Sequence, residues 1–329
     1  MFTEQSLRQY PEVVKAFTGV PSEAFWDMMK QVESQVADYE LGRHEHGERQ
    51  RAVGAGRQFN QALSVRVAVV LTYLRLHVPQ AVVALLYGCT QSDVSRELRR
   101  LLPLISQVLP VPVVWQVVEP GTSLPPDGLT LDSLSDGQVL IDATEQRVSR
   151  SQDEATRDAS YSGKRKAYTL KTQMVTDGQH HIEAISQAVP GAMHDKTLAD
   201  ALATVPRLPD GCQATADKGY QGLAAEVEWV TVCDTTTGAE HTVPRLILRT
   251  PFKKPKGQDL TPQQAAFNHA LGHIRIRIEH CIGWTKNWAI LATRFRCDHG
   301  IYTPIFQLIC GLVNAQTDRW QHPKNPYCA

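Results

Sequence analysis

The segment 138-QVLIDATEQRV-148 decides the fold class, because its residues alternate with the period of two that a half-buried β-strand requires. Val139 and Ile141 fall on one side of this strand, and Leu140 and Asp142 on the other. Further strands are predicted over residues 168–175 and 181–189, and the Asp-Gly dipeptide at 177–178 between them is a strong hairpin signal. The segment is therefore the first of three predicted strands.

The pattern after these three strands alternates between helix and strand. A helix is predicted to begin at His194-Asp195 and to run to about residue 205, and a short strand at 213–216 leads into Asp217-Lys218-Gly219-Tyr220. Another strand follows at 245–249. A long helix then starts at Thr261-Pro262, where a Thr cap, Pro at the first helical position and Gln264 at the third are typical of a helix start. This order predicts an α/β layered domain over residues 138–320.

The N-terminal part of the chain is predicted to be all-α. An amphipathic helix at 22–39 is followed by three close-set helices, the first capped by Ser64, the second opening at Pro79 and the third capped by Thr90. A short helix, a turn with Gly88 and a capped helix are typical of a helix-turn-helix, although a plain three-helix bundle without a ligand fits the same pattern. The polar residues expected to face DNA from the third helix are Gln91, Ser92, Ser95, Arg96 and Arg99.

The predicted organisation is thus an N-terminal helical region (1–50), a helix-turn-helix domain (51–106), a linker (107–137), the α/β domain (138–320) and a tail (321–329). The linker rests on the six prolines between residues 103 and 128, a density that disfavours regular structure.

Charge and composition exclude several classes of protein. The 34 Lys and Arg residues balance the 34 Asp and Glu residues, so the chain is not a globally basic DNA binder. Residues 245–296 nevertheless hold ten basic residues against two acids, and 147–171 hold seven against three, so local surfaces can still grip a polyanion. No stretch is long and apolar enough for a membrane span, the start lacks a secretory signal, and the seven cysteines form no Cys-x-x-Cys pair, which predicts a cytoplasmic protein.

Three carboxylates stand at positions next to the predicted core. Asp142 lies within the first strand, Asp217 ends a later one, and Glu279 follows the buried Ile278 on the long helix. Acids in such places are costly to desolvate unless they are paired or bound to metal. Taken singly, Asp142 fits a salt bridge and Asp217 a turn. If they converge, they suit Mg²⁺, which prefers oxygen ligands.

Six short motifs follow one another along the chain: IDATE (141–145), YSGKRK (161–166), PGAMHD (190–195), DKGYQG (217–222), KKP (253–255) and RIRIEH (275–280). In type and order they resemble the motifs of the DDE transposases of bacterial insertion sequences, in the insertion-sequence-five group related to PIF/Harbinger transposases. Residues 66–105 resemble the helix-turn-helix of the family. The chain departs from the usual pattern at Ala143, where the family has Gly, and at Thr285-Lys286, where it often has Leu-Lys.

The resemblance implies an RNase H-like catalytic fold with Asp142, Asp217 and Glu279 as catalytic and metal-binding residues. It implies two Mg²⁺ (or Mn²⁺) ions per site, one shared by the two aspartates and one by Asp142 and Glu279. The implied reaction is hydrolysis at the ends of the element, followed by attack of the freed 3′-hydroxyl on target DNA. The expected partners are double-stranded DNA, as terminal inverted repeats and target, and a second copy of the chain on that DNA, in a bacterial cytoplasm at the nucleoid.

Other residues are expected to support this chemistry. His194 and Asp195 are candidates for an auxiliary group, although Asp195 at a helix start is more often a cap. The basic residues expected to contact DNA outside the helix-turn-helix are Lys164, Arg165, Lys166, Lys253, Lys254, Lys256, Arg275 and Lys286; Arg275 also fits an ion pair with Glu279. Two alternatives stay open, a DNA-binding regulator descended from a transposase and a metal-dependent endonuclease without strand transfer.

Overall fold

The computed structural model describes residues 1–42, 59–119, 121–233 and 239–321, which form two compact units. Unit 1 contains Met1–Val111, Thr285–Thr293 and Pro304–Ala315, and unit 2 contains Pro112–Trp284, Arg294–Thr303 and the chain from Gln316 onward. The predicted boundary at 50/51 and the tail beyond residue 321 lie outside the described residues. Among the described helices, none combines the length and apolar character needed to cross a membrane.

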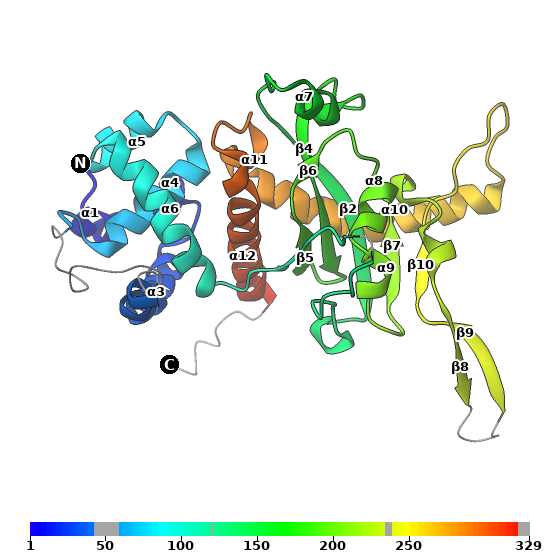
Figure 1. Cartoon of the computed structure of the whole chain (residues 1–329). Coiled ribbons are helices and arrows are strands. Elements are labelled where there is room, and N and C mark those ends of the chain that lie inside the picture. Colours follow the sequence, from blue (N-terminus) through cyan, green and yellow to red (C-terminus); the bar gives the residue numbers. More distant parts are fainter. Residues whose placement is uncertain (43–58, 120, 234–238, 322–329) are drawn as a thin grey trace. The chain divides into compact units, whose positions relative to one another are not determined.

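Unit 1 is helical and is organised around α4 (Figure 1). Its helices are α1 (Glu4–Gln9), α2 (Pro11–Thr18), α3 (Ser22–Gly42), α4 (Leu63–Leu76), α5 (Gln80–Tyr87), α6 (Gln91–Gln107), α11 (Ala289–Ala292) and the middle of α12 (Tyr302–Gln321). Every residue of α4 from Ser64 to Leu74 is buried, because α2, α5, α6 and α11 surround it. Arg66 is tolerated there because its guanidinium pairs with Glu97 of α6 at 2.7 Å.

The ends of the helix-turn-helix confirm the predicted turn. Gly88 closes α5 in the left-handed region (φ 67°), and Thr90 caps α6 in a reciprocal box with Asp93. The prediction that Ser64 caps α4 is wrong, because Ala62 holds the cap position and the Ser64 hydroxyl donates to Glu4 instead. The amphipathic face of α3 is buried within unit 1 itself through Phe25, Met29 and neighbouring residues.

Unit 2 is built on a mixed sheet in the order β1-β5-β4-β2-β7-β10. Its strands are β1 (Val113–Trp115), β2 (Gln138–Arg147), β4 (Ala167–Asp177), β5 (Ile182–Ser186), β7 (Gln213–Ala216) and β10 (Ile247–Arg249), with β3 (Tyr161–Ser162) and β6 (Val189–Pro190) paired to β4. β5, β4 and β2 are antiparallel, whereas β7 runs parallel to β2 and β10 parallel to β7. A separate hairpin, β8 (Trp229–Cys233) with β9 (Glu240–Pro244), was not predicted.

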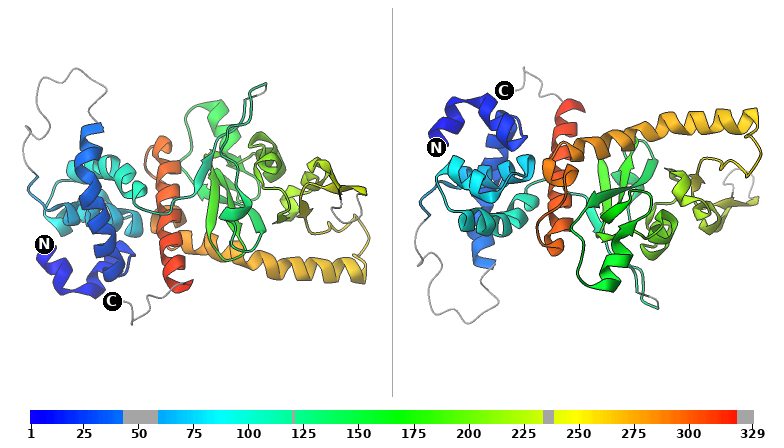
Figure 2. Two further views of the ribbon diagram at one scale, coloured as in Figure 1. Left: turned by 90° about the horizontal axis from the view of Figure 1, so that it is seen from below. Right: turned by 90° about the horizontal axis from the view of Figure 1, so that it is seen from above.

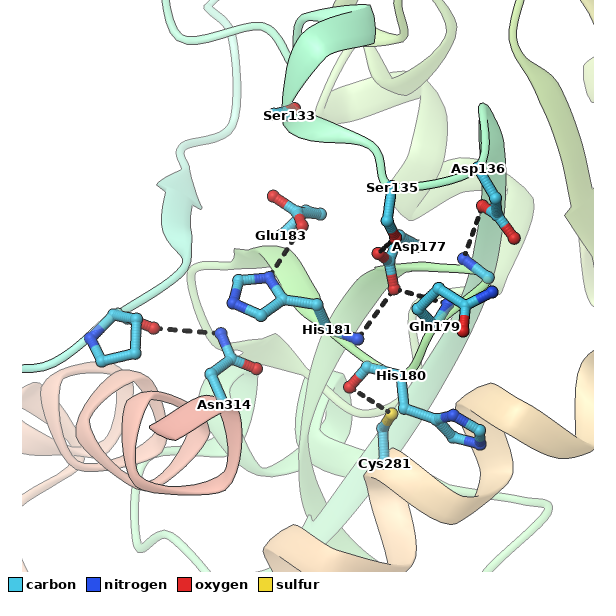
Figure 3. A network of polar contacts seen from close by, with 12 residues as sticks. Ser133, Ser135, Asp136, Asp177, Gln179, His180, His181, Glu183, Cys281 and Asn314 are labelled. Carbon is cyan, nitrogen blue, oxygen red and sulfur yellow. Dashed lines mark hydrogen bonds and ion pairs between the residues drawn. The ribbon is translucent and has the colours of Figure 1, made fainter. Parts of the chain in front are cut away.

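The predicted hairpin turn after β4 is confirmed, and Figure 3 shows the contacts that hold it. One carboxylate oxygen of Asp177 accepts hydrogen bonds from the backbone N–H groups of Gln179 and His181, each at 2.8 Å. Asp136 accepts from the backbone of Gly178 and lies so close that a Cβ there would meet its carboxylate. A side chain at residue 178 would therefore require the Asp136 carboxylate to move.

Helices cover both faces of the sheet. Outside the sheet, this part of the chain forms α7 (Glu154–Ser160), α8 (Asp195–Ala201), α9 (Thr204–Arg207) and α10 (Pro262–Lys286), with the 3₁₀ turns η1 (Leu131–Ser133), η2 (Lys218–Tyr220), η3 (Leu223–Glu226) and η4 (His299–Ile301). The two views of Figure 2 place α8 and α10 on opposite faces. Val139 and Ile141 belong to the core that Leu198 of α8 and the following Leu202 complete, which leaves Asp142 on the α10 side. The alternation read from residues 138–148 therefore sets which face carries the acid.

The Pro-rich linker contains regular structure and packs against the rest of unit 2. β1 pairs with β5 in parallel, and Trp115 is fully buried with its indole N–H donating to the Asp127 carbonyl. The buried Arg207 stacks on Trp115 and pairs with Asp127 at 3.0 Å, which fixes the segment to α9. Pro103, the first of the six prolines on which the linker prediction rested, lies inside α6. The apolar side chains around it are buried, and their burial outweighs the roughly 3 kcal/mol that an interior proline costs.

Candidate active site

Two aspartates are brought together by the register of parallel strands. β2 and β7 pair with Ile141 opposite Ala216, so the next residues along each strand, Asp142 and Asp217, lie at the same edge. Asp142 continues β2, whereas Asp217 leaves β7 and starts η2. The sequence pattern predicted which strand carries each aspartate, and the register of β2 with β7 shows that the two aspartates are neighbours.

Glu279 comes from α10, whose start has the predicted reciprocal cap between Thr261 and Gln264. Its exposed fraction is 55%, compared with 17% for Asp142 and 29% for Asp217. The buried residues beside it, Ile278 and Cys281, fix this part of the helix, so that Glu279 stands at the edge of the buried stripe as predicted.

One guanidinium contacts all three acids. Nη2 of Arg275 lies 3.0 Å from Oδ2 of Asp142 and 3.7 Å from Oε1 of Glu279, while Nη1 lies 3.0 Å from Oδ1 of Asp217. The Arg275 side chain is 13% exposed, and its Nε is buried without a partner among the described residues. The sequence suggested the pair with Glu279 from the spacing of four, whereas the contacts with both aspartates depend on the fold.

Burial dominates the electrostatics of the site. Desolvation raises the pKa of Asp142, the Arg275 guanidinium and the backbone N–H of Ala143 oppose that rise, and the nearby Asp217 adds to it. The pKa of Tyr220 is raised well above its usual value by complete burial and by the nearby carboxylates of Asp142, Asp195 and Asp217. Tyr220 thus keeps its proton.

The donor chemistry of this cluster fits a hard divalent cation, because all three groups offer carboxylate oxygens. Within the described ranges, however, no three His, Cys, Asp or Glu side chains are arranged to hold a metal ion as they stand. The three carboxylates surround the Arg275 guanidinium instead.

A second ion pair lies against the turn that carries Asp217. Lys171 of β4 donates to Oδ1 of Asp195 at 2.7 Å and to the carbonyl of Met193 at 2.6 Å, and both side chains are largely buried. A Cβ on Gly219 would lie 2.4 Å from Oδ2 of Asp195, so only glycine lets this pair approach η2. Lys171 was missed, although a lysine inside an otherwise buried strand is a detectable signal.

The interpretation of Asp195 as a helix cap is therefore wrong. The cap position of α8 belongs to His194, which makes no capping bond through its side chain, and Asp195 is the first helical residue. Its carboxylate has turned to Lys171 because a buried ammonium group needs a counter-charge.

Most of the predicted DNA contacts are accessible. Lys164, Arg165 and Lys166 form an exposed turn before β4, and Lys253, Lys254 and Lys256 lie in an exposed loop before α10, where Lys254 pairs with Asp259. Lys286 ends α10 and is half-buried. On α6, the side chains of Gln91, Ser92, Arg96 and Arg99 are exposed, Ser95 is half-buried, and Arg96 pairs with Asp93.

Comparison with known proteins agrees with this geometry. Residues 141–314 match the family described as DDE superfamily endonuclease, and residues 63–110 match the helix-turn-helix of DDE superfamily endonuclease. Since the first match covers more than half of the chain, the protein belongs to the DDE superfamily endonucleases, as the motifs predicted. Its helical unit contains a helix-turn-helix of that superfamily.

A curated relative carries a more specific name. A protein of Microchaete diplosiphon, named probable transposase for insertion sequence element IS702, is 29% identical over 181 residues, which are 54% of this chain and 56% of the relative. The match thus spans about half the length of that relative. No solved structure matches the chain. Membership of the insertion-sequence-five group stays a prediction.

Proposed function

We propose that the protein is the transposase of an insertion sequence, which binds the ends of its element and cuts and joins DNA strands with Asp142, Asp217 and Glu279. The observation that carries this proposal is the convergence of three acids, from β2, from the end of β7 and from α10, on one guanidinium. A protein that only binds DNA has no physical need for such a cluster, because desolvated like charges cost stability. The name of the curated relative supports the same function.

The topology supports an RNase H-like assignment for unit 2. The strands β2, β4 and β5 are antiparallel, and the next strand of this sheet core, β7, pairs in parallel with β2. Asp142 of β2 and Asp217 at the end of β7 lie at the same edge of these two neighbouring strands. We infer that Asp142, Asp217 and Glu279 hold two Mg²⁺ or Mn²⁺ ions. When bound, such ions generate a hydroxide nucleophile from water and stabilise the leaving oxygen of a phosphodiester.

The residues of the chain itself supply binding and placement. The exposed basic side chains of Lys164, Arg165 and Lys166 would bind DNA phosphates. The exposed face of α6 would contact the edges of the nucleobases in the terminal inverted repeats. Two element ends must be joined in one reaction, so we expect two copies of the chain on DNA. We also expect the protein to act in the bacterial cytoplasm, where it would associate with the nucleoid.

The test uses the full-length protein with labelled DNA that carries the terminal inverted repeats, in Mg²⁺ and in Mn²⁺. Asp142→Asn, Asp217→Asn and Glu279→Gln should each lower cleavage by about 10³-fold or more, since several kcal/mol of transition-state stabilisation are lost. Each variant should still retard the DNA in a gel. Cleavage at the wild-type rate by any one of them removes that residue from the site.

The products separate the alternative functions. Nicked and joined DNA supports a transposase, and nicking without joining in either metal supports a metal-dependent endonuclease. Binding without nicking in both metals supports the DNA-binding regulator.

A further inference from the structure

The position of Arg275 has a consequence for how the proposed site takes up metal. Its two terminal nitrogens contact oxygens of all three acids, so one positive charge is shared by three negative charges. A guanidinium usually pairs with one carboxylate through two parallel hydrogen bonds. Here the fork is divided between Asp142 and Asp217, each at 3.0 Å, which ties β2 to the turn after β7.

The same oxygens are the ones a divalent cation would need. Oδ2 of Asp142 accepts a hydrogen bond from Arg275, Oδ1 of Asp217 lies 3.0 Å from its other terminal nitrogen, and Oε1 of Glu279 lies 3.7 Å away. A carboxylate gains most from whichever cation is nearest, so arginine and metal compete for one set of negative charges. The buried Nε makes no hydrogen bond to a described residue, so the side chain is held in place chiefly through its contacts with the acids.

We propose that Arg275 is the internal counter-ion of the metal-free site, which keeps the three acids together and must leave at least one of them when metal binds. The proposal rests on the function proposed above, because it concerns the same three carboxylates. Arg275 is accordingly a positioning residue that sets the metal concentration at which the site fills. Removing its charge should increase the affinity for metal and lower the thermal stability of the metal-free protein.

The experiment measures Mn²⁺ binding to the full-length protein without DNA, by the electron paramagnetic resonance signal of the free ion. Arg275→Gln should bind Mn²⁺ roughly tenfold more tightly than the wild type, within the usual range of coupling between two ligands of one site. Arg275→Lys, which keeps the charge but loses the fork, should lie between the two. Thermal unfolding in EDTA gives a second readout, in which Arg275→Gln melts lower than the wild type and recovers on addition of Mn²⁺.

Arg277→Gln is the matched control. It makes the same change of charge two residues along α10. Arg277 contacts Gln138 at 3.3 Å and Asp136 at 4.0 Å, and neither is one of the three proposed metal ligands. Its affinity for Mn²⁺ should stay close to that of the wild type. An equal gain in Arg277→Gln would show that general charge, and not the contact with the acids, governs binding, and would overturn the proposal.

A third variant separates failure of this inference from failure of the proposed function. If Asp142→Asn loses Mn²⁺ binding while Arg275→Gln binds no tighter than the wild type, the metal site stands and the role of Arg275 is refuted. If Asp142→Asn binds Mn²⁺ as the wild type does, the acids are not a metal site, and both proposals fall.

Discussion

The buried ion pair between Lys171 and Asp195 offers a direct test of how the turn carrying Asp217 is held. Asp195→Ala removes one partner and leaves the Lys171 ammonium group with the Met193 carbonyl alone. Breaking a fully buried pair costs about 3–5 kcal/mol. Because the Asp195 side chain is 17% exposed and one hydrogen bond survives, we expect about 2–3 kcal/mol here.

Amide hydrogen exchange measures this loss locally, which suits a chain of two units. Peptides that cover α8 and residues 217–220 should exchange roughly 30- to 150-fold faster in Asp195→Ala, since 1.4 kcal/mol corresponds to a factor of ten. The double variant with Lys171→Met should recover much of the protection, because both charges are then gone.

The surface pair between Lys196 and Asp200 on the same helix provides the control. It is spaced i,i+4 and much more exposed, so Asp200→Ala should change exchange by less than about fivefold. If Asp195→Ala and Asp200→Ala behave alike, the Lys171–Asp195 pair does not hold the turn, and the reasoning is refuted.

Three further predictions follow from burial and charge. Tyr220→Phe should keep cleavage and stabilise the protein by about 1 kcal/mol in chemical unfolding, because the hydroxyl is buried without a partner among the described residues; loss of cleavage would give it a chemical role. Burial raises the pKa of Cys281 to about 12, so its thiol stays protonated at pH 8 and should resist iodoacetamide while the exposed Cys233 reacts; labelling of Cys281 in the native protein would contradict its burial. Lys164→Gln should weaken DNA binding equally for all sequences and reduce the salt slope by about one, and a slope unchanged in a filter-binding titration would remove Lys164 from the interface.

The sequence predicted those parts of the site that depend on local patterns. The alternation around Asp142, the Asp-Gly turn and the cap at Thr261 each rest on neighbours within a few residues, and each is confirmed. The capping box at Thr90 is confirmed for the same reason. Local periodicity and cap chemistry need no knowledge of the rest of the fold.

The features that were missed depend on contacts between distant segments. β1 has three residues and lies among prolines, so no period can reveal it, and only pairing with β5 makes it a strand. Asp195 stands where a helix cap is expected locally, but its carboxylate pairs with Lys171, which lies 24 residues earlier in the chain. The contacts of Arg275 with Asp142 and Asp217 likewise arise only when α10 covers the sheet.

The most direct measurement of the central claim is iron-directed cleavage of the protein backbone. When hydrogen peroxide is added, Fe²⁺ bound in place of Mg²⁺ is oxidised to Fe³⁺ and reduces the peroxide to hydroxide and a hydroxyl radical, which cuts the chain next to the ligands of the iron, and mass spectrometry locates the cuts. We expect cuts beside Asp142, Asp217 and Glu279, all suppressed by excess Mg²⁺ and by Asp142→Asn. Cuts at other positions, or cuts that Asp142→Asn leaves unchanged, would contradict a metal site built from these three acids.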